Sequence, residues 1–90
     1  MSIAPYSSSP LFDETSLPAA LRSEHTTKAG VWALIRIFEG SVRYTELDPL
    51  SETVLTPERP GLIEPRRRHF VTPLGPVRMQ VEFYRARPDV

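Results

Sequence analysis

The chain has 90 residues, with 11 Lys and Arg against 11 Asp and Glu, so its formal net charge is zero. It contains no cysteine, which excludes a disulfide scaffold, a thiolate metal site and a cysteine nucleophile. A neutral domain has no general electrostatic attraction to nucleic acid or to anionic membranes. No apolar run approaches the roughly 18 residues of a membrane helix, and no basic segment followed by an apolar one opens the chain. We therefore expect a soluble cytoplasmic domain with neither nucleic acid nor a membrane as partner.

Proline spacing excludes a helical bundle. The chain has 10 prolines and 4 glycines, and between Pro49 and Pro76 no uninterrupted stretch reaches the length of an ordinary helix. This spacing leaves short strands joined by proline turns. The sequence therefore predicts one all-β domain over residues 1–90, either a small antiparallel β-barrel or a two-sheet sandwich.

The N-terminal half predicts an extended arm, a short helix and a hairpin. Residues 1–11 are small, polar and proline-bearing, which is typical of an arm. Residues 16–24 predict a helix of about two turns, with Ser16 as N-cap and Pro18 in the first turn. The apolar run 31–38 predicts a strand covered on both faces. Residues 41–47 alternate, and Glu39-Gly40 predicts a hairpin turn between these two strands.

The C-terminal half predicts four more strands, over 51–55, 62–64, 69–72 and 77–84. The last of these alternates for eight residues, with Val77, Met79, Val81 and Phe83 on one face. Residues 86–90 are expected to form a loose tail. The predicted core comprises Trp32, Leu34, Ile35, Ile37, Val42, Tyr44, Ile63, Val71, Met79, Val81 and Phe83.

The two histidines, His25 and His69, are the candidate metal ligands. Each lies at the edge of a predicted strand, and in a closed barrel both could face its mouth. Two imidazoles and a carboxylate form a common site for zinc, iron(II) or manganese(II). Glu82, on the polar face of its strand, is the preferred carboxylate, and Glu64 is the alternative. The other interpretation is that both histidines are surface or turn residues without a ligand.

Basic residues provide a second candidate site. Arg66, Arg67 and Arg68 form a run that could bind an oxyanion or small molecule, or could be a solvated loop. Lys28, Glu64, Arg66 and Arg68 are therefore further candidates for a ligand pocket.

Two motif blocks resemble a known family of small domains, the TehB/YeaR-like proteins, which are related to tellurite resistance. The first block contains Phe12, Asp13, Leu17, Pro18, His25, Thr27, Lys28, Gly30, Trp32, Glu39 and Gly40. The second contains Pro60, Gly61, Ile63, Pro65, His69, Pro73, Leu74, Gly75, Pro76, Val81, Glu82, Phe83, Tyr84 and Arg85. The resemblance covers about residues 10–85.

The resemblance implies a cupin-type β-barrel in which His69 occupies the metal-ligand position of the second cupin motif. Thr27 stands where the first motif would supply a second histidine after His25. Some relatives carry this domain fused to a methyltransferase, an activity that does not transfer to a chain without that domain.

Two functions follow from the sequence. The first is a cupin-like protein that binds a divalent metal or small ligand at the barrel mouth and acts in tellurite resistance or a related stress response. The second is a non-catalytic ligand-binding or regulatory module with an apolar barrel pocket and no metal. The sequence leaves catalysis open. A β-domain of this size with exposed edges also predicts a homodimer, and the N-terminal arm could add a strand to a neighbour.

Overall fold

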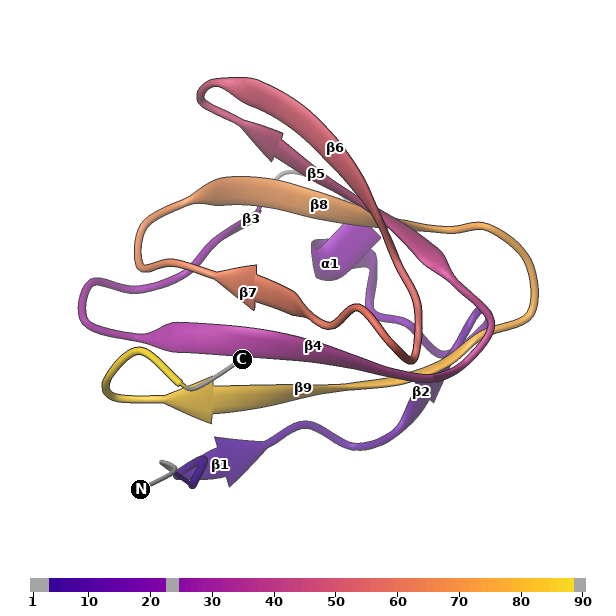
Figure 1. Ribbon diagram of the computed structural model, residues 1–90, viewed down its shortest axis with the longest axis horizontal. Coiled ribbons are helices and arrows are strands. Elements are labelled where there is room, and N and C mark those ends of the chain that lie inside the picture. The colour runs from indigo at the N-terminus through magenta and orange to yellow at the C-terminus, as the bar shows by residue number, and fades with distance from the viewer. Residues whose placement is uncertain (1–3, 23–24, 89–90) are drawn as a thin grey trace.

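The computed structural model describes residues 4–22 and 25–88 and contains two antiparallel β-sheets, which we call sheets A and B (Figure 1). Sheet A has the order β1 (Ser7–Ser8), β9 (Arg78–Tyr84), β4 (Trp32–Glu39) and β7 (Gly61–Ile63), with β2 (Phe12–Asp13) also paired to β9. Sheet B has the order β3 (His25–Thr26), β8 (Arg68–Pro73), β5 (Val42–Leu47) and β6 (Leu50–Leu55). The predicted all-β class is confirmed. The two sheets are not closed into a barrel, so the arrangement is the sandwich alternative.

The predicted hairpin over residues 31–47 is wrong, because β4 and β5 belong to different sheets. Gly40 lies at the corner between them with a φ of +78°, and a Cβ there would lie 2.2 Å from the Pro76 carbonyl oxygen. Only glycine fits this left-handed, close-packed position. The hairpin forms one strand later, where Leu47 pairs with Leu50 across a turn that contains the cis Asp48-Pro49 peptide bond.

The predicted helix is reduced to one turn, α1 (Ala19–Arg22). Ser16 does not act as its N-cap, because the Ser16 hydroxyl accepts a hydrogen bond from the Asp13 backbone N–H at 2.8 Å. The Asp13 carboxylate in turn accepts from the backbone N–H groups of Thr15 and Ser16, at 2.8 Å each. These hydrogen bonds satisfy the backbone N–H groups of Asp13, Thr15 and Ser16 outside the helix, and α1 begins only at Ala19. Residues 23–24 of the predicted helix lie outside the described residues.

The described part of the N-terminal arm pairs with β9 of its own chain. Ser7 and Ser8 lie opposite Phe83 and Glu82 in the register of β1 and β9. Backbone hydrogen bonds from Tyr6 N–H to the Phe83 carbonyl (2.9 Å) and from Ser9 N–H to the Val81 carbonyl (2.8 Å) extend this pairing. The arm thus covers an edge of sheet A.

The core lies between the sheets and matches the predicted set closely. Nine of the predicted residues are buried, whereas Trp32 and Phe83 are half-buried. The buried hydrophobic residues that the pattern missed are Leu17, Ala33, Leu55, Val77 and Tyr84.

The outer face of sheet A is only partly covered, so the prediction of a strand covered on both faces holds for part of the run 31–38, and Phe38 is 48% exposed. Leu34 is fully buried and Tyr84 is 3% exposed, although both belong to the outer face. Pro88, within the predicted loose tail, is buried, and the Arg87 guanidinium lies 5.7 Å from the centre of the Trp32 ring. The described part of the tail therefore packs on the protein. Residues 89–90 lie outside the described residues.

Candidate functional site

A cavity of about 180 Å³ lies between the two sheets. Its walls come from the N-terminal segment, from α1 and from the inner faces of both sheets. Nine of its twelve lining residues are hydrophobic, and the three polar ones are Ser9, Thr27 and His69. The hydrophobic residues are Phe12, Leu21, Ala33, Ile35, Ile63, Val71, Met79, Val81 and Phe83. A cavity of this composition favours an apolar guest.

The polar residues of the wall are bonded to nearby backbone groups. The Ser9 hydroxyl donates to the Pro10 carbonyl and accepts from the Val81 N–H, both at 2.9 Å. The Thr27 hydroxyl donates to the Glu64 carbonyl at 3.0 Å. These bonds fix the wall and reduce the hydrogen-bonding capacity that it presents to a guest.

His69 is the one titratable side chain among the lining residues, and it is 1% exposed. Its Nδ1 lies 2.8 Å from the Arg67 carbonyl oxygen. Because a carbonyl oxygen only accepts hydrogen bonds, Nδ1 of His69 carries a proton. The Tyr44 ring packs beside the imidazole, with the two ring centres 5.8 Å apart.

A carboxylate that the sequence did not single out lies next to His69. Glu46 pairs with His69 in the register of β5 and β8, and its Oε2 accepts a hydrogen bond from the Tyr44 hydroxyl at 3.0 Å. Burial, followed by the charge of Glu46, raises the pKa of Tyr44 far above its usual value. Tyr44 therefore stays a neutral donor throughout the physiological pH range. The alternation of Val42, Tyr44 and Glu46 along one strand face is the signal that could have placed Glu46 beside the core.

His25 and His69 lie opposite each other on neighbouring strands of sheet B, whereas Glu82 lies in sheet A. His25 lies directly opposite His69 in the pairing of β3 with β8; the His25 side chain lies outside the described part of the structure. Glu82 lies on the outer face of sheet A, where it accepts hydrogen bonds from Arg36 Nε at 3.1 Å and from the Tyr84 hydroxyl at 2.9 Å. Sheet A therefore lies between Glu82 and the cavity.

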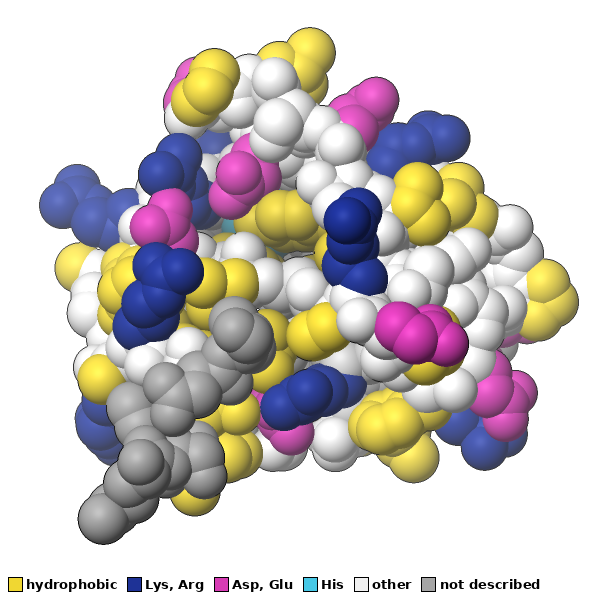
Figure 2. Space-filling view, in the orientation of Figure 1, with side chains coloured by type: hydrophobic (Ala, Val, Ile, Leu, Met, Phe, Trp, Pro, Cys, Tyr) yellow, Lys and Arg dark blue, Asp and Glu magenta, His cyan; other side chains and the backbone are white. Residues whose placement is uncertain are grey.

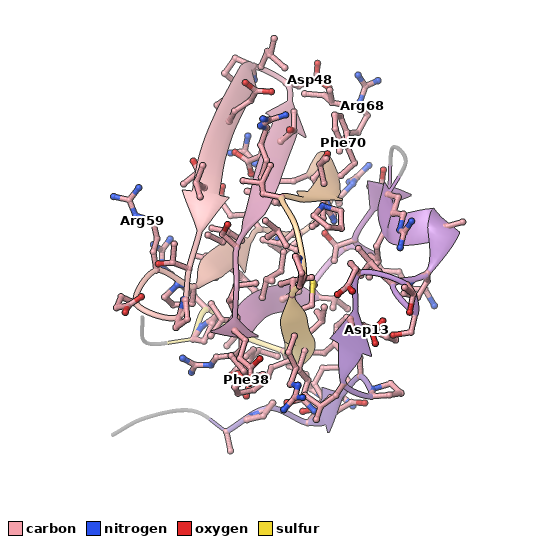
Figure 3. The ribbon with its side chains drawn as sticks, turned by 90° about the vertical axis from the view of Figure 1, so that its right-hand side faces the viewer. Asp13, Phe38, Asp48, Arg59, Arg68 and Phe70 are labelled. Carbon is pink, nitrogen blue, oxygen red and sulfur yellow. The ribbon has the colours of Figure 1, made fainter. Side chains whose placement is uncertain are left out.

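The remaining candidates lie around the loop from β7 to β8. Glu64 forms an ion pair with Arg67 at 2.8 Å, and Arg68 forms one with Asp48 at 3.0 Å. Figure 3 shows Asp48 and Arg68 side by side at the tip of sheet B. Arg66 is exposed, with a φ of 63°.

Acidic and basic side chains lie close together in the upper left part of the space-filling view (Figure 2). Two of the three arginines of the run, Arg67 and Arg68, form ion pairs with neighbouring carboxylates, which reduces their availability for an external oxyanion.

Among the side chains that the structure describes, which do not include that of His25, no three from His, Cys, Asp or Glu are grouped closely enough to hold a metal ion. Within residues 4–22 and 25–88, no helix has the length and hydropathy to cross a membrane.

Comparison with known proteins identifies the domain type. The family model of the TehB-like domain matches residues 7–81. TehB from Haemophilus influenzae has a similar structure, with a TM-score of 0.80 and 25% sequence identity over 88% of this chain and 30% of that chain. A protein from Escherichia coli strain K12 has a TM-score of 0.82 over 98% of this chain and 93% of that chain; its 16% identity shows the fold alone. No curated protein matches the chain.

Proposed function

Because the chain belongs to the TehB-like domain family, we propose that it binds a small, mainly apolar molecule in the cavity between its sheets. We propose further that this binding serves tellurite resistance or a related stress response. The cavity of about 180 Å³ with its nine hydrophobic lining residues is the observation that carries the proposal.

The size of the cavity suits a guest of about six to eight non-hydrogen atoms. An apolar cavity of about 150 Å³ in an engineered protein stays dry and binds benzene. The proposal follows the second function expected from the sequence, a binding module with an apolar pocket.

The proposal concerns binding only. The chain corresponds to 30% of the TehB chain. What the rest of TehB does is not assigned to this domain.

An NMR titration with benzene tests the proposal. We expect saturable shifts of the backbone amides of Ile35, Val71 and Met79, which line the cavity from three different strands. The amides of β6 provide the internal control, because none of its residues lines the cavity. Absence of saturable shifts at the three lining residues, or equal shifts in β6, would contradict the proposal.

The register of His25 and His69 supports a second candidate function, binding of a divalent metal. In this version Glu46 replaces Glu82 as the carboxylate, because Glu46 is the register partner of His69 on its other side. Imidazole ligands must be neutral, so affinity should fall as the pH drops through about 6.

Titration with zinc, iron(II) and manganese(II) tests the second candidate. His69→Ala should abolish binding, and Glu82→Gln should leave it unchanged. If none of the three ions binds at neutral pH, the metal-binding candidate is wrong and the apolar binding module remains.

A further inference from the structure

A second hollow, of about 310 Å³, adjoins the cavity on the side of the N-terminal arm. Its lining residues are Tyr6, Ser7, Thr26, Thr27, Lys28, Val31 and Phe83. Two of them, Thr27 and Phe83, also line the inner cavity. Thr27 and Phe83 therefore form a shared boundary between the two spaces.

The two shared residues are held differently. Thr27 is 8% exposed, its hydroxyl is bonded to the Glu64 carbonyl, and its own carbonyl accepts from the Arg66 N–H at 3.1 Å. Phe83 is half-buried and packs against the core without a polar anchor on its side chain. Of these two boundary side chains, Phe83 is therefore the one that can rotate without breaking a side-chain hydrogen bond.

Among the described residues, no Lys or Arg lines the inner cavity, whereas one lysine lines the outer hollow. Lys28, the single lysine of the chain, is exposed at its wall and forms no ion pair with a described residue. No Asp or Glu is among the described residues that line the hollow. An anion in the outer hollow would therefore meet one cation, Lys28, and no carboxylate among the described lining residues.

We propose that the natural ligand is an amphipathic anion, with its apolar part in the inner cavity and a carboxylate or similar oxyanion beside Lys28. This inference rests on the proposed function and adds the charge of the ligand to it. The charged group should stay outside the inner cavity, because an anion in a mostly apolar cavity would lose its hydration without sufficient compensation. Lys28 is then a specificity-determining residue, and the inner cavity supplies the affinity common to neutral and anionic guests.

Hexanoate and 1-hexanol are suitable probes, because they share a short alkyl chain and differ in the charge of the end group. We expect hexanoate to bind the wild-type protein more tightly than hexanol. Lys28→Met should weaken hexanoate by about fivefold, the range of a partly exposed ion pair, and leave hexanol unchanged. Arg59→Met removes the same charge from an exposed position that lines neither space, and should leave both probes unchanged.

The outcomes separate this inference from the proposed function. If hexanol binds but Lys28→Met leaves hexanoate affinity unchanged, the role of Lys28 is wrong and the apolar cavity stands. If Arg59→Met weakens hexanoate as much as Lys28→Met does, the effect comes from net charge and the inference is also wrong. If neither hexanol nor benzene binds the wild-type protein, the proposed function itself fails.

Discussion

A matched pair of substitutions distinguishes an open cavity from a packed interior. Val71 and Val42 are both buried in the core, 2% and 0% exposed, on adjacent strands of sheet B. Val71 lines the cavity and Val42 does not. Val71→Ile and Val42→Ile add the same methylene group to the two sites, so a difference in stability reports on the space available at each.

The expected effects have opposite signs. A buried methylene contributes about 0.8 kcal/mol when space exists for it, so Val71→Ile should raise the free energy of unfolding by about 0.5 to 1 kcal/mol. Overpacking costs about 1 to 3 kcal/mol, so Val42→Ile should lower it by that amount. The two variants should differ by about 2 kcal/mol, which corresponds to roughly 10 °C in melting temperature for a domain of this size.

Urea unfolding followed by circular dichroism measures both variants. Benzene titration of each variant adds a second readout: Val71→Ile should weaken benzene binding severalfold, whereas Val42→Ile should leave it unchanged. If Val71→Ile is as destabilising as Val42→Ile, the interior is filled at Val71 and the reasoning from the cavity is refuted.

Three further predictions concern the turn before α1, the C-terminal segment and the edge of sheet B. The hydroxyl of Thr15, followed by backbone N–H groups, lowers the pKa of Asp13 to about 2. The ionised carboxylate therefore stabilises the folded state at any pH above the pKa that Asp13 has in the unfolded chain, and this stabilisation is lost as the pH falls through about 2. Asp13→Asn should lower the melting temperature at pH 7 and abolish this pH dependence, and equal pH profiles of both proteins would contradict it. Deletion of residues 85–90 removes the buried Pro88 and the contact of Arg87 with the Trp32 ring, and should lower the free energy of unfolding by about 1 to 2 kcal/mol; an unchanged urea midpoint would refute the packing of the tail. The homodimer remains a prediction, and its expected contact is β6, which has six residues and is the longest described edge strand. Light scattering should give twice the chain mass of 10.2 kDa for the wild type and a monomer for Val54→Lys. A monomeric wild type would contradict the prediction.

Strand positions could be predicted from the sequence because they depend on local patterns. The segment 77–84 alternates without interruption, and it forms β9 with Met79 and Val81 inside. Sheet membership depends on long-range contacts instead. Glu39-Gly40 has the same local pattern in a hairpin and in a corner between sheets, and only the approach of Pro76 to Gly40 shows which one forms.

The candidate site was predictable in part. The sequence analysis expected His69 at a barrel mouth or on the surface, whereas it is 1% exposed and lies on the same strand face as the core residue Val71. Glu82 was chosen from the polar face of its strand, and that face points away from the cavity, toward Arg36. Glu46 becomes a neighbour of His69 through the register of β5 with β8, which the sequence pattern alone does not fix.

A crystal of the protein pressurised with xenon tests the central claim most directly. Xenon binds dry apolar cavities of this size, and its anomalous scattering locates it. The account predicts one strong xenon peak between the sheets, in contact with Ile35, Val71 and Met79. Absence of a peak there, with the space taken up by side chains or by ordered water, would contradict it.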